Sequence, residues 1–469
     1  MIEGEGAFEE FDWEAPIERF EQMLKDKATW FFDVDDFELL IDYYLDTGNL
    51  KKAQKALQVG ESQHPSAHGL KFRKAQLAIT GGQLNKALKL LDEIELLEPH
   101  SDEVMIMKAS IYSQQRNYKK AIYYYEKAAN LSEGNKDEIL LDLAFEYENA
   151  QEYDKAIECL KETLASNPEN EAALYEIAYC YELAEKHEEC IKYYHKFLDE
   201  NPYSFTAWYN LGNAYTKLEQ YSKSIQAFDF AVVIQPNFAS AHYNKGNAYM
   251  QLEKWDEALQ AYLETHKHEE AQAATLSYIG ECYEKIGQYP EALSYYLKAI
   301  EVDQSWGDAY LGIGIVKDLQ GQLSDGLHYI EKAIACNPDQ PDYWYVFAEG
   351  LKKADRFEAA ELAFEKVLTL EPDNINAIVD YTSLLEKEGL FSEAIIKIEE
   401  AKLRFPDEAE IAYKHASTLF QAGLYQEGKI ALEYCLDKFY SQKDLISEYF
   451  EEAKNIPIIA ELFELYKNK

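Results

Sequence analysis

The chain has 469 residues and a formal net charge of −40 at pH 7, from 86 acidic and 46 basic side chains. This charge excludes nucleic acid and anionic lipid headgroups as favoured partners, because both are bound by clustered Lys and Arg. It favours basic protein partners, or it serves only to keep a long, tyrosine-rich surface soluble. No apolar run approaches the length of about 18 residues that spans a membrane, so no membrane insertion is expected.

The acidic residues are concentrated at the N-terminus, where residues 1–50 hold 15 acids and 3 bases. We expect residues 1–33 to form an acidic segment with a capping helix over 16–27, whose apolar stripe has the helical period: Ile17, Phe20 and Leu24. The first residues lack a basic region followed by an apolar stretch. The sequence therefore predicts no secretory signal and a cytoplasmic protein.

Prolines recur through the chain on one 34-residue grid: Pro168, Pro202, Pro236, Pro338, Pro372 and Pro406. Two positions of the grid, Glu270 and Gln304, lack proline without disturbing the count. A constant period of this length is typical of a repeat architecture, in which each unit packs against its neighbours. It predicts about twelve tandem units, at 34–67, 68–101, 102–136, 137–170, 171–204, 205–238, 239–272, 273–306, 307–340, 341–374, 375–408 and 409–442.

Two places depart from the grid. The spacing from Pro99 to Pro168 exceeds two periods by one residue. We assign the extra residue to the turn at 133–136, since loops tolerate insertions better than helices do. The unit 239–272 ends without the proline turn, and we expect a local irregularity there. After the last unit, residues 443–469 are predicted to form C-terminal capping helices.

Within one unit the residue types follow a fixed spacing: Trp208, Leu211, Gly212, Tyr215, Phe228, Ala231 and Pro236. The apolar residues of 205–218 and of 222–234 recur at i, i+3, i+4 and i+7, which predicts two amphipathic helices joined by a short turn. Glycine recurs at the position of Gly212 in later units. Because glycine is unfavourable inside a helix, its recurrence predicts a close approach of two helices.

This spacing resembles the tetratricopeptide repeat, a pair of antiparallel helices per unit. The resemblance implies an all-α fold, a right-handed α-solenoid (superhelix) of about twelve helix–turn–helix repeats with capping helices at both ends. Bacterial proteins built from many such repeats, without an assigned function, are similar in character.

The sequence offers no motif for catalysis or for a cofactor. No C-x2-C pair is present, so a zinc or redox motif is not expected, and Cys180 and Cys282 occupy equivalent small-residue positions of their repeats. His266 and His268 were weighed as metal ligands, but side chains two positions apart point to different sides of a helix. We therefore predict a non-enzymatic protein without a metal or a cofactor.

The first helix of each repeat lines an inner groove in proteins similar to this one. Following the helical period, the residues that face this groove are Tyr175, Tyr179, Tyr209, Asn210, Asn213, Tyr243, Asn244, Asn247, Tyr278 and Glu281, with Tyr345, Glu349 and Tyr413 further along. Tyrosine supplies contact area with a polar tip, and asparagine can both donate to and accept from a peptide backbone. The alternative is that some of these residues only bridge neighbouring repeats.

One binding mechanism of the family can be tested on the sequence. Chaperone-binding members grip a terminal carboxylate with two asparagines and three basic residues. Asn213 and Asn244 match the asparagine positions, whereas the basic positions hold Tyr209, Ala274 and Tyr278. A buried carboxylate would lack charged partners here, so the clamp is expected to be absent and an acidic tail is not expected as the ligand.

These observations predict a non-catalytic scaffold that binds a protein or an extended peptide, neutral or basic, along the groove over residues 175–281. An alternative is a structural scaffold that uses its convex or terminal surfaces, with the acidic cap docking on a basic patch. A variant of it is a homo-oligomer formed through the terminal repeats. An enzyme without a recognisable motif is the remote alternative.

Overall fold

The computed structural model describes residues 14–132 and 134–467. Within these ranges the chain consists of 27 α-helices and two short 3-10 helices, without a strand. The chain divides into two compact units, residues 1–235 and 236–469. Residues 1–13 of the expected N-terminal segment (1–33) and Glu133 of the expected insertion lie outside the described residues.

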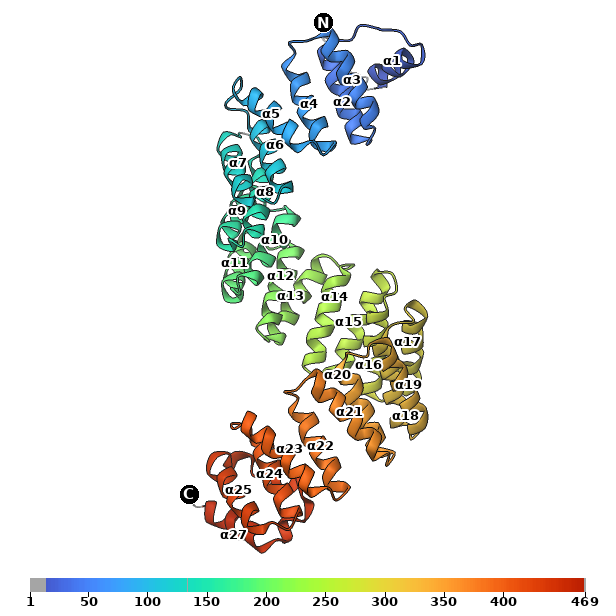
Figure 1. The fold of residues 1–469 in the computed structure, drawn as a ribbon, viewed down its shortest axis with the longest axis vertical. Coiled ribbons are helices and arrows are strands. Elements are labelled where there is room, and N and C mark those ends of the chain that lie inside the picture. Colours follow the sequence, from blue (N-terminus) through green and yellow to red (C-terminus); the bar gives the residue numbers. More distant parts are fainter. Residues whose placement is uncertain (1–13, 133, 468–469) are drawn as a thin grey trace, which may run out of the picture. The chain divides into compact units, whose positions relative to one another are not determined.

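The first unit begins with α1 (Glu14–Lys25) and continues with six helix pairs, which succeed one another along the ribbon (Figure 1). The pairs are α2 (Val34–Asp46) with α3 (Leu50–Gln63), α4 (His68–Thr80) with α5 (Leu84–Glu95), α6 (Asp102–Gln114) with α7 (Tyr118–Leu131), α8 (Lys136–Asn149) with α9 (Tyr153–Ser166), α10 (Glu171–Leu183) with α11 (His187–Glu200), and α12 (Phe205–Lys217) with α13 (Tyr221–Ile234).

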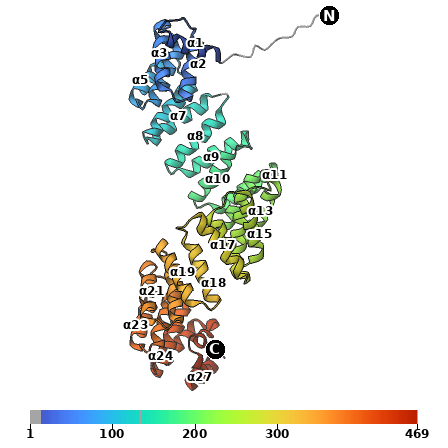
Figure 2. The same ribbon diagram turned by 90° about the vertical axis from the view of Figure 1, so that its right-hand side faces the viewer.

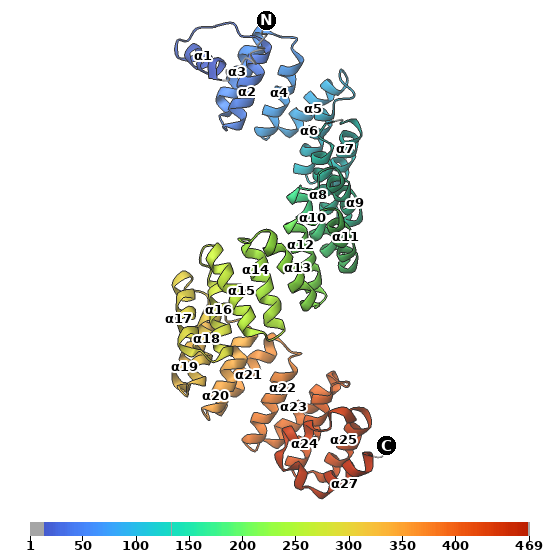
Figure 3. The same ribbon diagram turned by 180° about the vertical axis from the view of Figure 1, so that it is seen from behind.

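The second unit contains six further pairs, shown from two other sides in Figures 2 and 3. They are α14 (Ala239–Gln251) with α15 (Trp255–His268), α16 (Ala273–Ile286) with α17 (Tyr289–Val302), α18 (Gly307–Leu319) with α19 (Leu323–Cys336), α20 (Pro341–Lys353) with α21 (Phe357–Leu370), α22 (Ile375–Lys387) with α23 (Phe391–Arg404), and α24 (Ala409–Gln421) with α25 (Tyr425–Lys438). The unit ends with α26 (Leu445–Tyr449) and α27 (Pro457–Tyr466), separated by a 3-10 turn.

The turn between the two helices of every pair contains one residue with positive φ. These residues are Gly48, Gly82, Arg116, Gln151, Glu185, Glu219, Glu253, Gly287, Gly321, Asp355, Gly389 and Gly423. The next residue closes the turn: the amide of Asn49 donates to the carbonyl oxygen of Tyr44 at 2.7 Å, as in a Schellman motif. All steps between these turns are 34 residues except the 35-residue step from Arg116 to Gln151, which spans the expected insertion.

The recurring glycines mark close contacts between the two helices of a pair, as the sequence predicts. A methyl group on Gly212 would lie 2.5 Å from Cε1 of Phe228, and one on Gly246 would lie 2.8 Å from Cε1 of Tyr262. Such separations are shorter than any ordinary contact, so only glycine lets these aromatic rings pack against the facing helix. In these two repeats an aromatic ring of the second helix therefore packs on the glycine of the first helix.

Candidate functional site

The first helices of the repeats form one face of each unit, and we call it the first-helix face. In the first unit α10 and α12 enclose a hollow of about 260 Å³ on this face. Tyr175, Tyr179, Tyr209, Asn210 and Asn213, all expected at the groove, line this hollow, and His187 and Cys190 of α11 line it too. Tyr175 is 40% exposed and Tyr179 is 48% exposed, so the structure leaves two aromatic rings at the surface beside a recess.

Other contacts hold the walls of the hollow in place. The rings of Tyr175 and Tyr209 meet edge to face, with centroids 6.3 Å apart. Lys217 Nζ lies 2.6 Å from Glu182 Oε1, which joins the two helices and neutralises both charges. The hollow therefore combines aromatic area with a locally neutral rim, in contrast to the strong negative charge of the whole chain.

Asn210 lies at the hollow as expected, but its side chain is bonded inside the core. Its side chain is only 3% exposed, and its Nδ2 donates to the carbonyl oxygen of Leu174 at 2.9 Å and to Tyr194 Oη at 3.2 Å. These bonds join α12 to α10 and α11 inside the core. A peptide anchor must reach solvent, so we assign Asn210 a packing role and leave it out of the proposed contact surface.

In the second unit the corresponding residues pack mainly on one another. Tyr262, on the second helix α15, stacks on Tyr278 with centroids 5.3 Å apart and meets Tyr243 edge to face at 5.8 Å. Its hydroxyl donates to Asn247 Oδ1 at 2.6 Å. Tyr243, Asn244, Asn247 and Tyr278 are all partly buried. The sequence did not single out Tyr262, although it follows Phe228 by one period.

Three more expected groove residues differ in their environments. Burial, and then the nearby Glu284 carboxylate, raise the pKa of Glu281 above its usual value. Tyr345 donates its hydroxyl to Asp380 and so bridges successive first helices. Tyr413 is fully buried and donates to the carbonyl oxygen of Phe439 at 3.1 Å. The expectation that Tyr413 continues the groove surface is therefore wrong, because its side chain is buried and its hydroxyl bonds the residue that follows α25.

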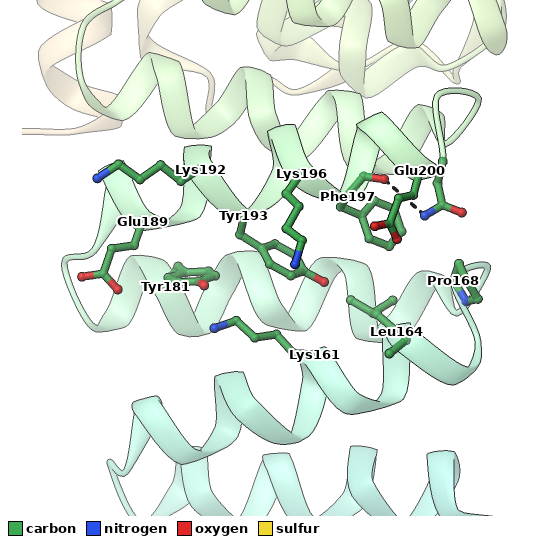
Figure 4. Close-up of a pocket in the computed structure, with 12 residues that line it drawn as sticks. Lys161, Leu164, Pro168, Tyr181, Glu189, Lys192, Tyr193, Lys196, Phe197 and Glu200 are labelled. Carbon is green, nitrogen blue, oxygen red and sulfur yellow. Dashed lines mark hydrogen bonds between the residues drawn. The ribbon is translucent and has the colours of Figure 1, made fainter.

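A second hollow of about 520 Å³ lies between the second helices α9 and α11 of the first unit. Figure 4 shows the ring of Tyr193 between the side chains of Lys161 and Lys196, and Lys192 also lines the hollow. Lys161 Nζ lies 6.0 Å from the centroid of Tyr193. Sequence reasoning missed this hollow because it followed only the first helices.

A group of potential metal ligands occurs once among the described residues, formed by Glu148, Glu176 and Cys180. Burial, a hydrogen bond to Glu148 and the negative charge of that carboxylate raise the pKa of Glu176 to about 8. Burial is also the largest reason why the pKa of Cys180 is raised, to about 12. His266 and His268, weighed from the sequence, are not part of this group. His268 lies 3.5 Å from Glu264 and stacks on His242.

Several family models match parts of the chain. A model described as TPR repeat matches residues 212–253, and models described as tetratricopeptide repeat match 237–305, 102–135 and 341–374. A model of anaphase-promoting complex, cyclosome, subunit 3 matches 149–231. A comparison with curated proteins gives no match. The helix pairs define an all-α repeat protein. The chain is a tetratricopeptide-repeat protein, a class whose members are in general interaction scaffolds.

Solved structures are similar to the chain at low identity. The structure of the APC/C hetero-tetramer Cut9–Hcn1 is 14% identical, with 87% of this chain and 93% of that chain covered and a TM-score of 0.43. A tetratricopeptide repeat protein from Parabacteroides merdae is 19% identical, with 51% and 94% covered and a TM-score of 0.41. YrrB, described as a TPR protein with an unusual peptide-binding site, is 21% identical, with 39% and 95% covered and a TM-score of 0.31. At these sequence identities and TM-scores, the partners of the similar proteins are not transferred to this chain.

Among the described residues, no helix combines the length and the apolar composition that a membrane crossing requires.

Proposed function

We propose that this protein is a non-catalytic scaffold that binds an extended, neutral or basic peptide segment on the first-helix face. The observation that supports this most is the 260 Å³ hollow of the first unit, which has two half-exposed tyrosines beside it. Tyrosine contributes large contact area at a low entropic cost, and it is enriched at the centres of protein interfaces. In this proposal Tyr175 and Tyr179 supply the contact area, and Asn213 anchors the backbone of the peptide.

The second unit contributes a separate and weaker part of the proposed surface. The candidates there are Tyr243, Asn244, Asn247, Tyr278 and Glu281. However, the rings of Tyr243 and Tyr278 already pack against Tyr262. Truncating them would disturb the packing of the repeat as well as any contact with a partner. A test of binding is therefore sharper in the first unit.

The test uses the full chain and peptides selected on it from a random display library. We expect selected peptides to be neutral or basic, and the double variant Tyr175→Ala/Tyr179→Ala to weaken their binding by about tenfold or more, as for interface tyrosines at a hot spot. Tyr123→Ala/Tyr203→Ala is the matched control, since Tyr123 is 50% and Tyr203 is 83% exposed away from the hollow. Equal binding by both variants with unchanged helicity would refute this placement.

The hollow of Figure 4 favours a second candidate function: a scaffold that binds its partner on the second helices of its repeats, here α9 and α11. Lys161, Lys192 and Lys196 would then attract an acidic segment of a partner, and the rings of Tyr181 and Tyr193 would pack against its apolar side chains. The variant Lys192→Glu/Lys196→Glu tests this against Lys119→Glu, an exposed lysine on α7. An acidic partner whose binding is unchanged by the first variant does not use this hollow.

We also propose that the protein works in a reducing compartment, and we take this to be the cytoplasm. All six cysteines are free, and four of them are buried in the repeats as small apolar side chains. Cysteines kept unpaired in this way are usual in proteins of the cytosol. Free-thiol counting on the protein isolated from its own cells under acid quench checks this: six thiols are expected, and fewer would count against it.

A further inference from the structure

Three potential metal ligands converge between two successive first helices of the first unit. Glu148 lies at the end of α8, and Glu176 and Cys180 are one helical turn apart on α10, so that both point to the same side of that helix. One oxygen of each carboxylate and the Sγ of Cys180 all lie within 4.8 Å of one another. Two helices thus contribute three donor atoms to one small volume.

The repeat geometry explains why these positions meet. The equivalent positions three periods later hold Met250, Tyr278 and Cys282, and there Cys282 Sγ contacts Met250 Sδ at 3.6 Å. Two of these positions, 250 and 282, are therefore in contact in another repeat, where none of the three carries a carboxylate. Glu148 and Glu176 add two carboxylates to the cysteine, whereas the other repeat has methionine and tyrosine at these positions.

The group lacks any cation to balance it. The nearby lysines are used elsewhere: Lys217 pairs with Glu182 and Lys186 pairs with Asp154. Among the residues that the structure describes, no ion pair reaches Glu148 or Glu176. Adjacent carboxylates that are partly withdrawn from water repel each other unless a proton or a metal ion lies between them.

The thiol gives an independent indication of a ligand. Cys180 is fully buried, and within the described part of the chain its Sγ makes no hydrogen bond. It is nevertheless directed at the two carboxylates rather than at apolar neighbours alone. A buried cysteine that only fills space, such as Cys190, has no such group of oxygens around it.

We propose that Glu148, Glu176 and Cys180 bind one divalent transition-metal ion of the Zn²⁺ type. In tetrahedral zinc sites the metal lies about 2.0–2.2 Å from carboxylate oxygen and about 2.3 Å from sulfur, so the donors would close in by about 1 Å from their present separation. The thiolate selects Zn²⁺ or Co²⁺ over Ca²⁺ and Mg²⁺, which prefer oxygen ligands only. Because both glutamates are partly exposed, water can fill the fourth position, and binding releases to solvent the thiol proton and the proton held between the two carboxyl groups.

This site does not depend on the proposed peptide surface. Its role would be to join α8 to α10 and so to stiffen two successive repeats, which meet here through the side chains of Glu148, Glu176 and Cys180. Binding of Zn²⁺ is therefore expected to raise the stability of the folded chain by mass action.

Titration of the full, reduced chain with Co²⁺ tests the proposal, because a thiolate bound to Co²⁺ gives a charge-transfer band in the near ultraviolet. We expect one equivalent of Co²⁺ to produce this band and Zn²⁺ to remove it. Cys180→Ser should abolish the band. Cys282→Ser, at the equivalent position of another repeat, should leave it unchanged. No band up to about 1 mM Co²⁺, the weak end of useful affinities, or a band that survives Cys180→Ser would overturn the site.

Zn²⁺ binding followed by native mass spectrometry supplies the second measurement and does not require the cysteine variant to fold. Wild-type chain should carry one Zn²⁺, and Glu148→Gln and Glu176→Gln should each weaken binding by about tenfold or more, equivalent to about 1.4 kcal/mol or more. Exposed Glu188→Gln on α11 is the control and should bind as the wild type does. Unchanged affinity in both carboxylate variants would show that the metal is held elsewhere.

Discussion

A buried ion pair in the second unit allows a quantitative prediction. Lys414 on α24 is 1% exposed, and its Nζ lies 2.6 Å from Glu386 Oε2 on α22 and 2.7 Å from Ser383 Oγ. Thr418 and Gln421 also donate to the Glu386 carboxylate, at 2.6 and 3.3 Å. The variant Glu386→Gln leaves the ammonium group buried without its counter-charge. We expect it to lower the local free energy of unfolding by about 3–5 kcal/mol.

Removing both charges should cost much less. In Lys414→Met/Glu386→Leu each former partner keeps another bond: Ser383 still donates to Val379 O at 2.9 Å, Thr418 to Lys414 O at 2.8 Å, and Gln421 to Tyr449 O at 3.4 Å. These bonds leave no buried polar group unpaired. We therefore expect the double variant to lie within about 1.5 kcal/mol of the wild type, since well-packed apolar replacements of buried pairs are often neutral.

Hydrogen exchange of peptides from α22 and α24 measures this effect locally, which suits a repeat chain whose units open separately. The exposed pair of Lys387 and Asp355, at 3.1 Å, is the control, and Lys387→Met should change local stability by less than about 1 kcal/mol. If the double variant is as destabilised as Glu386→Gln, the coupling between the two charges is absent and this reasoning is refuted.

Three further predictions concern packing, pH and turns. Gly212→Ala should destabilise the first unit by about 1–3 kcal/mol, because the added methyl group overlaps Phe228, and Phe228→Leu should relieve part of the loss in thermal unfolding. Burial, and then Lys402, lower the pKa of His415 from 6.5 to about 4. Because the unfolded chain takes up this proton first, stability should fall as the pH drops from 6.5 to 4, by at most about 3 kcal/mol. His415→Leu should flatten that part of the pH profile in urea titrations, whereas an unchanged slope would assign it to other groups. Glu219→Gly should increase the free energy of unfolding by up to about 1 kcal/mol and so raise the unfolding temperature slightly, because residue 219 has a φ of +56°, which glycine adopts without strain. A lower unfolding temperature would show that the backbone entropy of glycine outweighs this strain.

The groove prediction illustrates how far residue patterns can be followed. The helical period placed Tyr175, Tyr179 and Asn213 on one side of their helices, and in the structure they line one hollow together with Asn210. The same period could not tell them from Asn210, which is one residue from Tyr209 but is buried by its bonds to α10 and α11. The period gives the direction of a side chain on its own helix, whereas the burial of Asn210 depends on the partners that α10 and α11 bring to it.

The sequence alone determined the all-α repeat class, because a 34-residue period with an amphipathic pattern in each half leaves one arrangement in which every apolar stripe is covered. It also determined the close helix contact at Gly212, since only glycine fits there. Only the tertiary structure decided which side chains meet across repeats: Glu148 with Glu176 and Cys180, and the lysines around Tyr193. These groups lie about 30 residues apart in the chain, and their distances follow from helix rotation and packing, which no local pattern encodes.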